Sequence, residues 1–232
     1  MVTIIMNTYN DKPEQLRTAI TGYQIQKIPC EIILSTIAGD SAIKIGEEMG
    51  IKKIVINEKP GICGQLNKAL EYAEGHWFCY ASGNDYALPN KLIDEHSLLL
   101  RKKKKLCYSA FYRGNKDLKI TGTNEFHPYN YRKHLMGNFM IDNAMTNMEI
   151  LKKYLPFRED VGNYLFWDMW LRIYEGEGNV FIYNPKPNFI YRLDGTGRHF
   201  RKKKDKNLWN KDERDRAFML KTHGVRYQPR IR

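Results

Sequence analysis

The sequence predicts an α/β fold in which a mainly parallel sheet is flanked by helices. Short apolar runs typical of buried strands occur at 2–6, 31–37, 52–58 and 76–81. Segments with apolar residues at helical spacing lie between or after them, at 13–26, 41–50, 64–75 and 88–105. Because strand and helix patterns alternate along the chain, we expect a parallel sheet that is covered by helices.

The second half of the chain has a different pattern, which predicts a smaller mixed sheet. A strand is expected at 106–113, a hairpin arm at 116–124, a strand running into a helix at 138–155, a helix at 164–175 and a strand pair at 179–193. We therefore expect one domain over residues 1–200, with halves at 1–105 and 106–200. Residues 201–232 are polar and basic, and are expected to form a C-terminal extension that includes a helix-like segment.

Composition narrows the class of protein. Hydrophobic residues make up 42% of the 232 residues, which is enough for a core. No stretch approaches the roughly 20 apolar residues that a membrane span needs. The first residues do not resemble a signal peptide, so we expect a cytoplasmic location. A peripheral position on the cytosolic face of a membrane is compatible with this expectation. The four cysteines lack close-pair spacing, which favours reduced thiols over a disulfide framework or a zinc site.

The net charge of +12 is unevenly placed, with basic blocks at 101–105 and 198–206. Such blocks indicate an anionic partner, and nucleic acid, anionic lipid and sugar nucleotides all qualify. Nucleic acid is the least favoured, because the chain has no recognisable nucleic-acid motif and its aromatic residues are not interleaved with the charge. For the block at 101–105 alone, a solvated lysine-rich surface explains the sequence equally well.

Polar clusters follow three of the predicted strands. They are "NTYN" after the first strand, "TIAGD" at the second and "SGND" after the fourth. Ligands of parallel α/β sheets bind beyond the carboxyl ends of the strands, so these clusters are expected on one edge of the sheet. The stretch 82–85 has three interpretations: a tight turn, a divalent-cation site with Asp85 and Asn84 as oxygen ligands, or direct hydrogen bonding to a sugar.

Four segments together resemble a known family. "VTIIMNTYN", "EIILSTIAGDS", "GICGQLNKALEYAEGHWFCYASGNDYALPNKL" and "PFREDVGNYLFWDMWLRIYE" occur in this order within residues 2–195. In order and spacing they resemble the inverting family 2 glycosyltransferases of the GT-A fold, which is Rossmann-like. The resemblance implies transfer of a hexose or pentose from a nucleotide-sugar donor, expected to be a UDP-sugar, to a hydroxyl of a glycan or lipid-linked acceptor. It also implies Mn²⁺ or Mg²⁺ as a cofactor.

The resemblance further implies which residues bind the donor. The expected nucleotide-sugar-binding residues are Thr8, Tyr9, Asn10, Thr36, Asp40, Asn67, Ser82, Gly83, Asn84 and Arg192. The family's acidic metal-binding motif corresponds to residues 82–85. Two positions that are acidic in the family carry neutral residues here, and Asp85 and Asn84 are the expected metal ligands. A loop near the family's C-terminus meets the diphosphate, and here that loop makes His199 a further expected metal ligand.

Inversion needs a base that takes the proton of the acceptor hydroxyl, and a carboxylate is the natural choice. The family's helix motif keeps one carboxylate in "WDMWLR", Asp168, whereas its usual base position is apolar here. Asp168 is therefore the expected base, with Asp142 and Glu159 as alternatives. The competing interpretation is structural, in which Asp168 bonds the backbone or Arg172, four residues on.

Another function stays open beside the transferase. A GT-A-like domain that has lost carboxylates could bind a sugar nucleotide or a glycan without catalysis. In either case the basic extension at 201–232 could hold an acceptor near a membrane or make a subunit contact.

Overall fold

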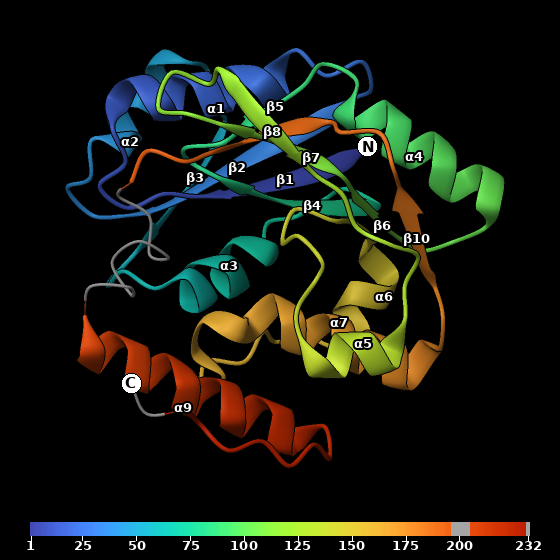
Figure 1. Ribbon diagram of the computed structural model, residues 1–232. Helices are drawn as coiled ribbons and strands as arrows, with labels where there is room; N and C mark the ends of the chain where they lie inside the picture. Colours follow the sequence, from blue (N-terminus) through green and yellow to red (C-terminus); the bar gives the residue numbers. More distant parts are fainter. Residues whose placement is uncertain (196–204, 231–232) are drawn as a thin grey trace.

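The computed structural model of the protein describes residues 1–195 and 205–230. Its centre is a seven-stranded sheet with the strand order β10-β6-β9-β4-β1-β2-β3 (Figure 1). The strands are β1 (Val2–Asn7), β2 (Cys30–Ile37), β3 (Lys53–Asn57), β4 (Trp77–Ser82), β6 (Leu106–Ser109), β9 (Met145–Asn147) and β10 (Phe181–Asn184). Strands β3, β2, β1 and β4 run parallel, whereas β9 runs antiparallel to its neighbours β4 and β6. The predicted mainly parallel sheet is confirmed.

A second, four-stranded sheet has the order β5-β11-β7-β8 and is mixed, as predicted. Its strands are β5 (Tyr86–Ala87), β7 (Phe111–Gly114), β8 (Ile120–Asn124) and β11 (Phe189–Arg192). The segment predicted as one strand at 106–113 divides at Ala110 between the two sheets. The pair predicted at 179–193 divides likewise, because Pro185 and Pro187 lack the N–H groups that would continue a ladder.

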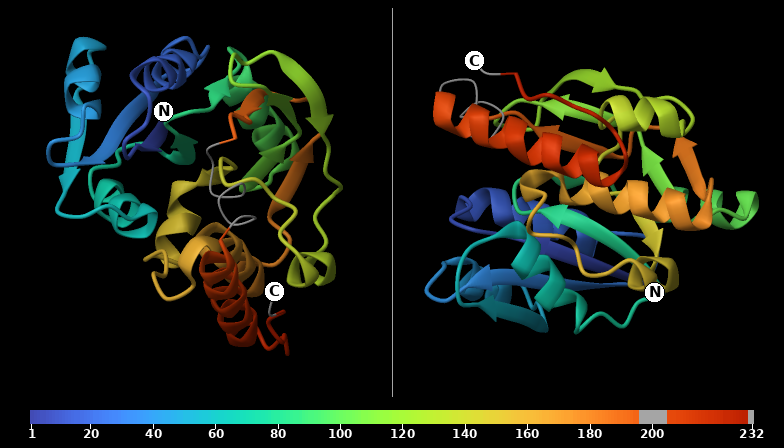
Figure 2. Two further views of the ribbon diagram at one scale, coloured as in Figure 1. Left: turned by 60° about the vertical axis from the view of Figure 1, so that its left-hand side comes forward. Right: turned by 90° about the horizontal axis from the view of Figure 1, so that it is seen from below.

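Helices cover both faces of the seven-stranded sheet (Figures 1 and 2). One face carries α1 (Pro13–Gln24), α2 (Ala42–Glu48) and α4 (Lys91–Lys102). The other carries α3 (Ile62–Leu70), α6 (Met148–Lys153) and α7 (Leu165–Glu177), with α5 (Tyr131–Met136) and the 3₁₀ turn η1 (Gly162–Tyr164) near α7. Side chains of β1 alternate between the two layers, so that Ile5 packs in one core while Ile4 and Met6 pack in the other.

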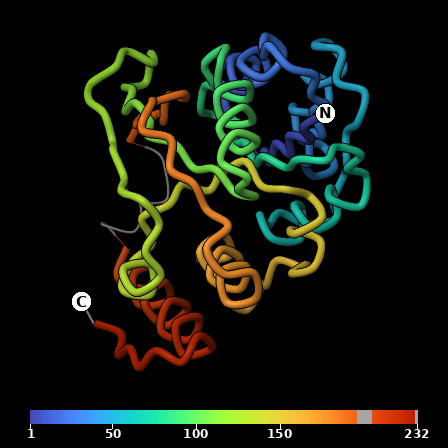
Figure 3. Tube along the Cα trace, turned by 90° about the vertical axis from the view of Figure 1, so that its right-hand side faces the viewer, coloured from blue at the N-terminus to red at the C-terminus, as the bar shows by residue number. Residues whose placement is uncertain are grey.

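The C-terminal extension contains a long helix, α9 (Lys206–Thr222). Asp205 caps it, because its Oδ1 accepts the backbone N–H groups of Asn207 and Leu208 at 2.8 and 3.1 Å. Helix α9 lies along an outer edge of the molecule, with α7 and α5 on its inner side (Figures 1 and 3). Within residues 1–195 and 205–230, no helix is both long and apolar enough to cross a membrane.

Candidate active site

The polar clusters after β1, β2 and β4 meet at one edge of the main sheet. Asn7 at the end of β1 is the register partner of Ser35 on β2 and of Ser82 on β4. Asn57 at the end of β3 donates a hydrogen bond to Ser35 Oγ at 3.0 Å. The strands are parallel, so their carboxyl ends coincide and the loops that follow them open on one edge. The predicted convergence of these clusters is confirmed.

A cavity of about 620 Å³ opens between the loop after β1 and the start of α3. Asn7 Nδ2 donates to the carbonyl of Ile62 at 2.9 Å, which ties the end of β1 to the first residue of α3. The tyrosine that follows in the loop, Tyr9, is 49% exposed, so its ring is available to a ligand. The lining includes the predicted residues Thr8 and Tyr9, together with Asn7, Lys59, Gly61, Glu159 and Asn163.

A second cavity of about 320 Å³ lies at the end of β4. Ile62 and Tyr80 line both cavities, so the two cavities are adjacent. Polar and charged side chains from three parts of the chain line the second cavity: Ser82, Asn84 and Asp85 after β4, Asp142 before β9, and Tyr191 on β11. A concave site with a few convergent polar groups is the usual form of a small-molecule site.

The turn at 82–85 is held in place by Arg192. Its backbone N–H donates to Asp85 Oδ1 at 2.9 Å, and its Nε donates to the carbonyl of Asn84 at 2.7 Å. Its Nη1 donates to the carbonyl of Lys116. Ser82 Oγ donates to Asn84 Oδ1 at 2.6 Å, inside the turn. Arg192 is only 8% exposed and therefore braces the turn, and its predicted contact with the donor stays a prediction.

Asp11 brings a carboxylate to this turn from the loop after β1. A methyl group added at Gly83 would lie 2.5 Å from Asp11 Oδ2, so the carboxylate packs directly on the glycine. The predicted Gly83 therefore serves to admit Asp11 rather than to contact the donor itself. Asp11 supplies the second carboxylate that the sequence 82–85 lacks.

The carboxylates of the cleft have raised pKa values. Burial raises the pKa of Asp85 to about 7, and the negative charges of Asp11 and Asp142 add to this against the opposing effect of Arg192. Burial alone raises the pKa of Asp142 to about 7. Burial also raises the pKa of Asp11. Carboxylates in a cleft whose pKa values are raised by burial and by one another are typical of functional sites.

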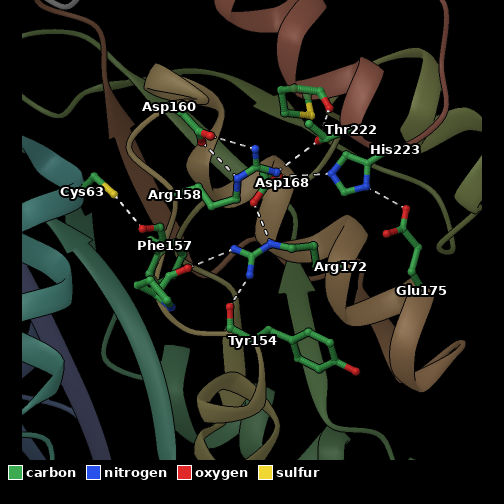
Figure 4. A network of polar contacts seen from close by, with 12 residues as sticks. Cys63, Tyr154, Phe157, Arg158, Asp160, Asp168, Arg172, Glu175, Thr222 and His223 are labelled. Carbon is green, nitrogen blue, oxygen red and sulfur yellow. Dashed lines mark hydrogen bonds and ion pairs between the residues drawn. The ribbon is translucent and has the colours of Figure 1, made fainter.

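Asp168, the predicted base, lies in a different environment (Figure 4). Its side chain is fully buried in α7, and its Oδ2 accepts from Arg172 Nε at 2.7 Å. Its Oδ1 contacts Arg158 Nη1 and His223 Nε2, each at 3.2 Å. Burial would raise the pKa of Asp168, but these partners outweigh it and hold the pKa below its usual range. Asp168 lines neither cavity and both of its oxygens are bonded to basic side chains, which favours the structural interpretation over the prediction that Asp168 is the base.

Four further predicted donor residues act within the protein. Asp40 accepts the backbone N–H of Asn10 on Oδ2 and that of Ala42 on Oδ1, both at 2.9 Å, and thus joins the loops after β1 and β2. Asn67 exchanges two hydrogen bonds of 2.9 Å with the backbone of Phe157. Thr36 is fully buried. Asn10, Thr36, Asp40 and Asn67 line neither cavity, and their assignment to the donor stays a prediction. The predicted metal ligand His199 lies outside the described residues.

Comparisons with protein-family models and with curated proteins give no match. Solved structures of TarS from S. aureus are similar to the chain. TarS 1–349 with UDP aligns over 94% of this chain and 64% of its own, with a TM-score of 0.70 and 14% identity. TarS 1–349 with UDP-GlcNAc aligns over 94% and 66%, with a TM-score of 0.70 and 15% identity. A longer TarS structure aligns over 84% and 37%, with a TM-score of 0.68 and 16% identity.

The chain has the GT-A fold. It spans between 37% and 66% of the TarS chains that it matches, and at this identity the likeness shows the fold alone. Asp142, which lines the smaller cavity, and Asp11, which packs on Gly83 but lines neither cavity, do not belong to the motifs that carry the resemblance. Asp142 was a candidate because it leaves a predicted strand near the expected acceptor pocket, whereas no sequence signal distinguished Asp11.

Proposed function

We propose that the protein is an inverting glycosyltransferase that uses a nucleotide-sugar donor, with a UDP-sugar as the expected class. The observation that carries the proposal is the pair of adjacent cavities at the carboxyl edge of the sheet, one of which is lined by the carboxylates of Asp85 and Asp142. The shared GT-A fold with TarS, which was crystallised with UDP and with UDP-GlcNAc, supports it. The acceptor is a hydroxyl of a glycan or a lipid-linked glycan.

The two cavities would hold different parts of the donor. The cavity of about 620 Å³ would hold the nucleoside, with Thr8 and Tyr9 in its lining. The turn at 82–85 would face the diphosphate, and the cavity of about 320 Å³ would hold the sugar. Lys59, in the lining of the first cavity, offers a positive charge toward the phosphates.

The cleft also suits a divalent cation. Among the described residues no group of three or more His, Cys, Asp or Glu side chains could hold a metal by itself. Mg²⁺ needs fewer, because it is commonly bound by one or two carboxylates together with substrate phosphates and water. Asp85 and Asp11 would hold it, and when bound the ion would stabilise the charge that develops on the leaving diphosphate. Asn84 is a weaker candidate, since its Oδ1 already accepts from Ser82.

Asp142 is the proposed base. It lies in the lining of the sugar cavity, and no hydrogen-bond or ion-pair partner in the described part of the chain occupies its carboxylate. It would take the proton of the acceptor hydroxyl while that oxygen forms a bond to the anomeric carbon and the bond from that carbon to the nucleoside diphosphate breaks. A pKa near 7 suits this task, because it lies close to the operating pH.

A calorimetric titration with UDP and UDP-GlcNAc, with and without Mn²⁺, tests donor binding, and release of UDP from UDP-GlcNAc tests turnover. We expect binding that tightens with Mn²⁺, and slow hydrolysis of the donor in the absence of an acceptor. Absence of binding by any of a panel of nucleotides and nucleotide sugars would overturn the proposal. Binding of a nucleotide sugar without turnover on any acceptor would favour the second candidate, a silent binder, which the neutral Ser82 and Asn84 support.

A further inference from the structure

The positive charge of the protein is concentrated at its C-terminus. Residues 196–232 contain 13 Lys and Arg but 4 Asp and Glu, so nine of the twelve net positive charges fall in these 37 residues. The preceding 195 residues are close to neutral. A uniform surface of solvated lysines would not produce this distribution, and an anionic partner for the C-terminal segment is indicated.

The inner side of α9 is fixed to the body of the protein. Asp212 and Glu213 are each 4% exposed, and they accept hydrogen bonds of 2.6 Å from the hydroxyls of Tyr164 and Tyr227. Met219 and Leu220 of α9 are part of the same hydrophobic core as α7. The helix therefore directs two of its acidic side chains inward and keeps them there.

Basic side chains occupy the outer side of α9. Asn207, Lys211, Arg214, Phe218 and Lys221 are exposed and follow one another at helical spacing, and we call them the outer stripe. Asp215, the third acidic residue of the helix, pairs with Lys211 at 2.9 Å. Phe218 is 44% exposed between Arg214 and Lys221. The stripe thus combines net positive charge with an exposed aromatic ring on a rigid helix that lies along the outer edge of the molecule (Figures 1 and 3).

We infer that the outer stripe of α9 binds the surface of an anionic lipid bilayer. Basic residues on a helix are attracted to anionic headgroups, and an exposed Phe among them is accommodated at the boundary between headgroups and acyl chains. A soluble polyanion offers the same charge complementarity but no apolar region for Phe218, so the bilayer is the better match. The inference does not depend on the transferase reaction.

The position of α9 connects such a surface to the cleft. Tyr164, which donates to Asp212, belongs to η1, and the neighbouring Asn163 lines the larger cavity. One layer of structure therefore separates a membrane under α9 from the donor site. This geometry would place the cleft within reach of an acceptor that is anchored in the same membrane.

The test is co-sedimentation of the full chain with vesicles of phosphatidylcholine alone and of an equal mixture of phosphatidylcholine and phosphatidylglycerol. We expect binding to the anionic vesicles that weakens with added salt. The double variant Arg214→Glu and Lys221→Glu should bind at least about 30-fold more weakly, since each basic residue near such a surface contributes about 1 kcal/mol. The matched control is Lys52→Glu with Lys119→Glu, two exposed lysines elsewhere that give the same net charge.

Three results separate the explanations. An equal loss of binding in the control variant would mean that total charge, and not the outer stripe, is responsible, and would overturn the inference. Binding to heparin or polyphosphate with no binding to anionic vesicles would also overturn it, in favour of a polyanion. Phe218→Ser should weaken binding to vesicles while leaving heparin binding unchanged, and an unchanged affinity for vesicles would count against insertion of the ring.

Discussion

Lys91 Nζ lies 2.7 Å from Glu95 Oε1, and both side chains are fully buried in α4. Lys91 also donates to the carbonyl of Asn143 at 3.2 Å, beside the proposed base Asp142. Glu95 Oε1 accepts in addition from Ser109 and Asn188. Removing two charges from water costs several kcal/mol per ion, so a buried pair of this kind is weak evidence for stability alone. Its contact with Asn143 suggests that it positions the loop at 142–143.

The double variant Lys91→Met with Glu95→Gln tests this role. Lys91→Met alone should lower the free energy of unfolding by about 3–5 kcal/mol, because it leaves Glu95 buried without its partner. The double variant should recover most of that loss, since Gln is neutral and still accepts from Ser109. Its turnover should nevertheless remain reduced, because the carbonyl of Asn143 has lost a donor. Urea unfolding and steady-state kinetics measure the two effects.

The exposed pair of Lys44 and Glu48, also four residues apart, is the control. Lys44→Met with Glu48→Gln also removes the exposed contact of Glu48 with Arg17, and it should still change stability by less than about 1 kcal/mol and leave kcat unchanged. If the buried double variant recovers both stability and kcat, the pair has no positioning role. A lower kcat with an unchanged KM for the donor is the outcome expected from a displaced base.

Asp142→Asn should reduce kcat by about 100-fold to 10,000-fold, which is the usual contribution of a general base. It should also stabilise the free protein above pH 7. The folded pKa of about 7 lies above the unfolded value of roughly 3.9, so the unfolded state releases the proton first and stability falls as pH rises between these values. Replacing the carboxylate removes this penalty. For a partly exposed group, the free energy of unfolding at pH 8 is expected to rise by about 1–2 kcal/mol.

The pH dependence of the wild-type protein provides the complementary measurement. With Asp142 as the base, kcat should rise with pH toward a plateau above about 7, and the Asp142→Asn variant should lose this dependence. A variant that loses activity but is less stable than the wild type at pH 8 would indicate a structural role for Asp142.

Gly83→Ala should weaken cation-dependent donor binding by tenfold or more, about 1.4 kcal/mol. The new methyl group would lie 2.5 Å from Asp11 Oδ2 and force the carboxylate away from the turn. Gly137→Ala is the control, because a methyl group there meets no atom within 4 Å. Calorimetric titration with UDP in the presence of Mn²⁺ measures the effect. Unchanged affinity in Gly83→Ala would remove Asp11 from the proposed cation site.

Much of the fold could be predicted because its signals are local. Continuous apolar runs identified β1 and β4, and parallel order then placed Asn7 and Ser82 on one edge, where register makes them partners. The position of the proposed base, Asp142, could not be predicted in the same way. Asp142 precedes β9, and β9 is antiparallel to β4, so the start of β9 and not its end lies at the active edge. Strand direction depends on tertiary packing, which the apolar pattern does not encode.

From the sequence, an ion pair of Asp168 could be anticipated only as the alternative to its role as the base. Its spacing to Arg172 indicated an ion pair, and that pair is present at 2.7 Å. The other partners, Arg158 and His223, come from ten and 55 residues away along the chain, and no local pattern reveals such contacts. Asp11 was missed for a similar reason, since its importance depends on the absence of a side chain at Gly83.

Asp168→Asn should therefore reduce stability and leave the chemical step intact. Loss of the buried charge leaves Arg172 without its anionic partner, whereas Arg158 keeps Asp160, and the cost is about 3 kcal/mol in the free energy of unfolding. Below the melting transition, kcat should stay within about threefold of the wild type, in contrast to Asp142→Asn. Circular dichroism and kinetics on the same samples measure both quantities.

The stabilisation that involves Asp168 depends on pH, because its partner His223 is titratable. Burial would lower its pKa, but the contacts with Asp168 and Glu175 outweigh it and raise the pKa above the usual value. The stabilisation from His223 is therefore fully present below the unfolded pKa of about 6.5 and is lost as pH rises through the higher folded pKa. The stability difference between the wild type and His223→Gln should shrink from pH 6 to pH 9, and Asp168→Asn should weaken this trend, because Glu175 remains beside His223. If Asp168→Asn instead keeps full stability and loses turnover, the base is Asp168 and the assignment to Asp142 falls.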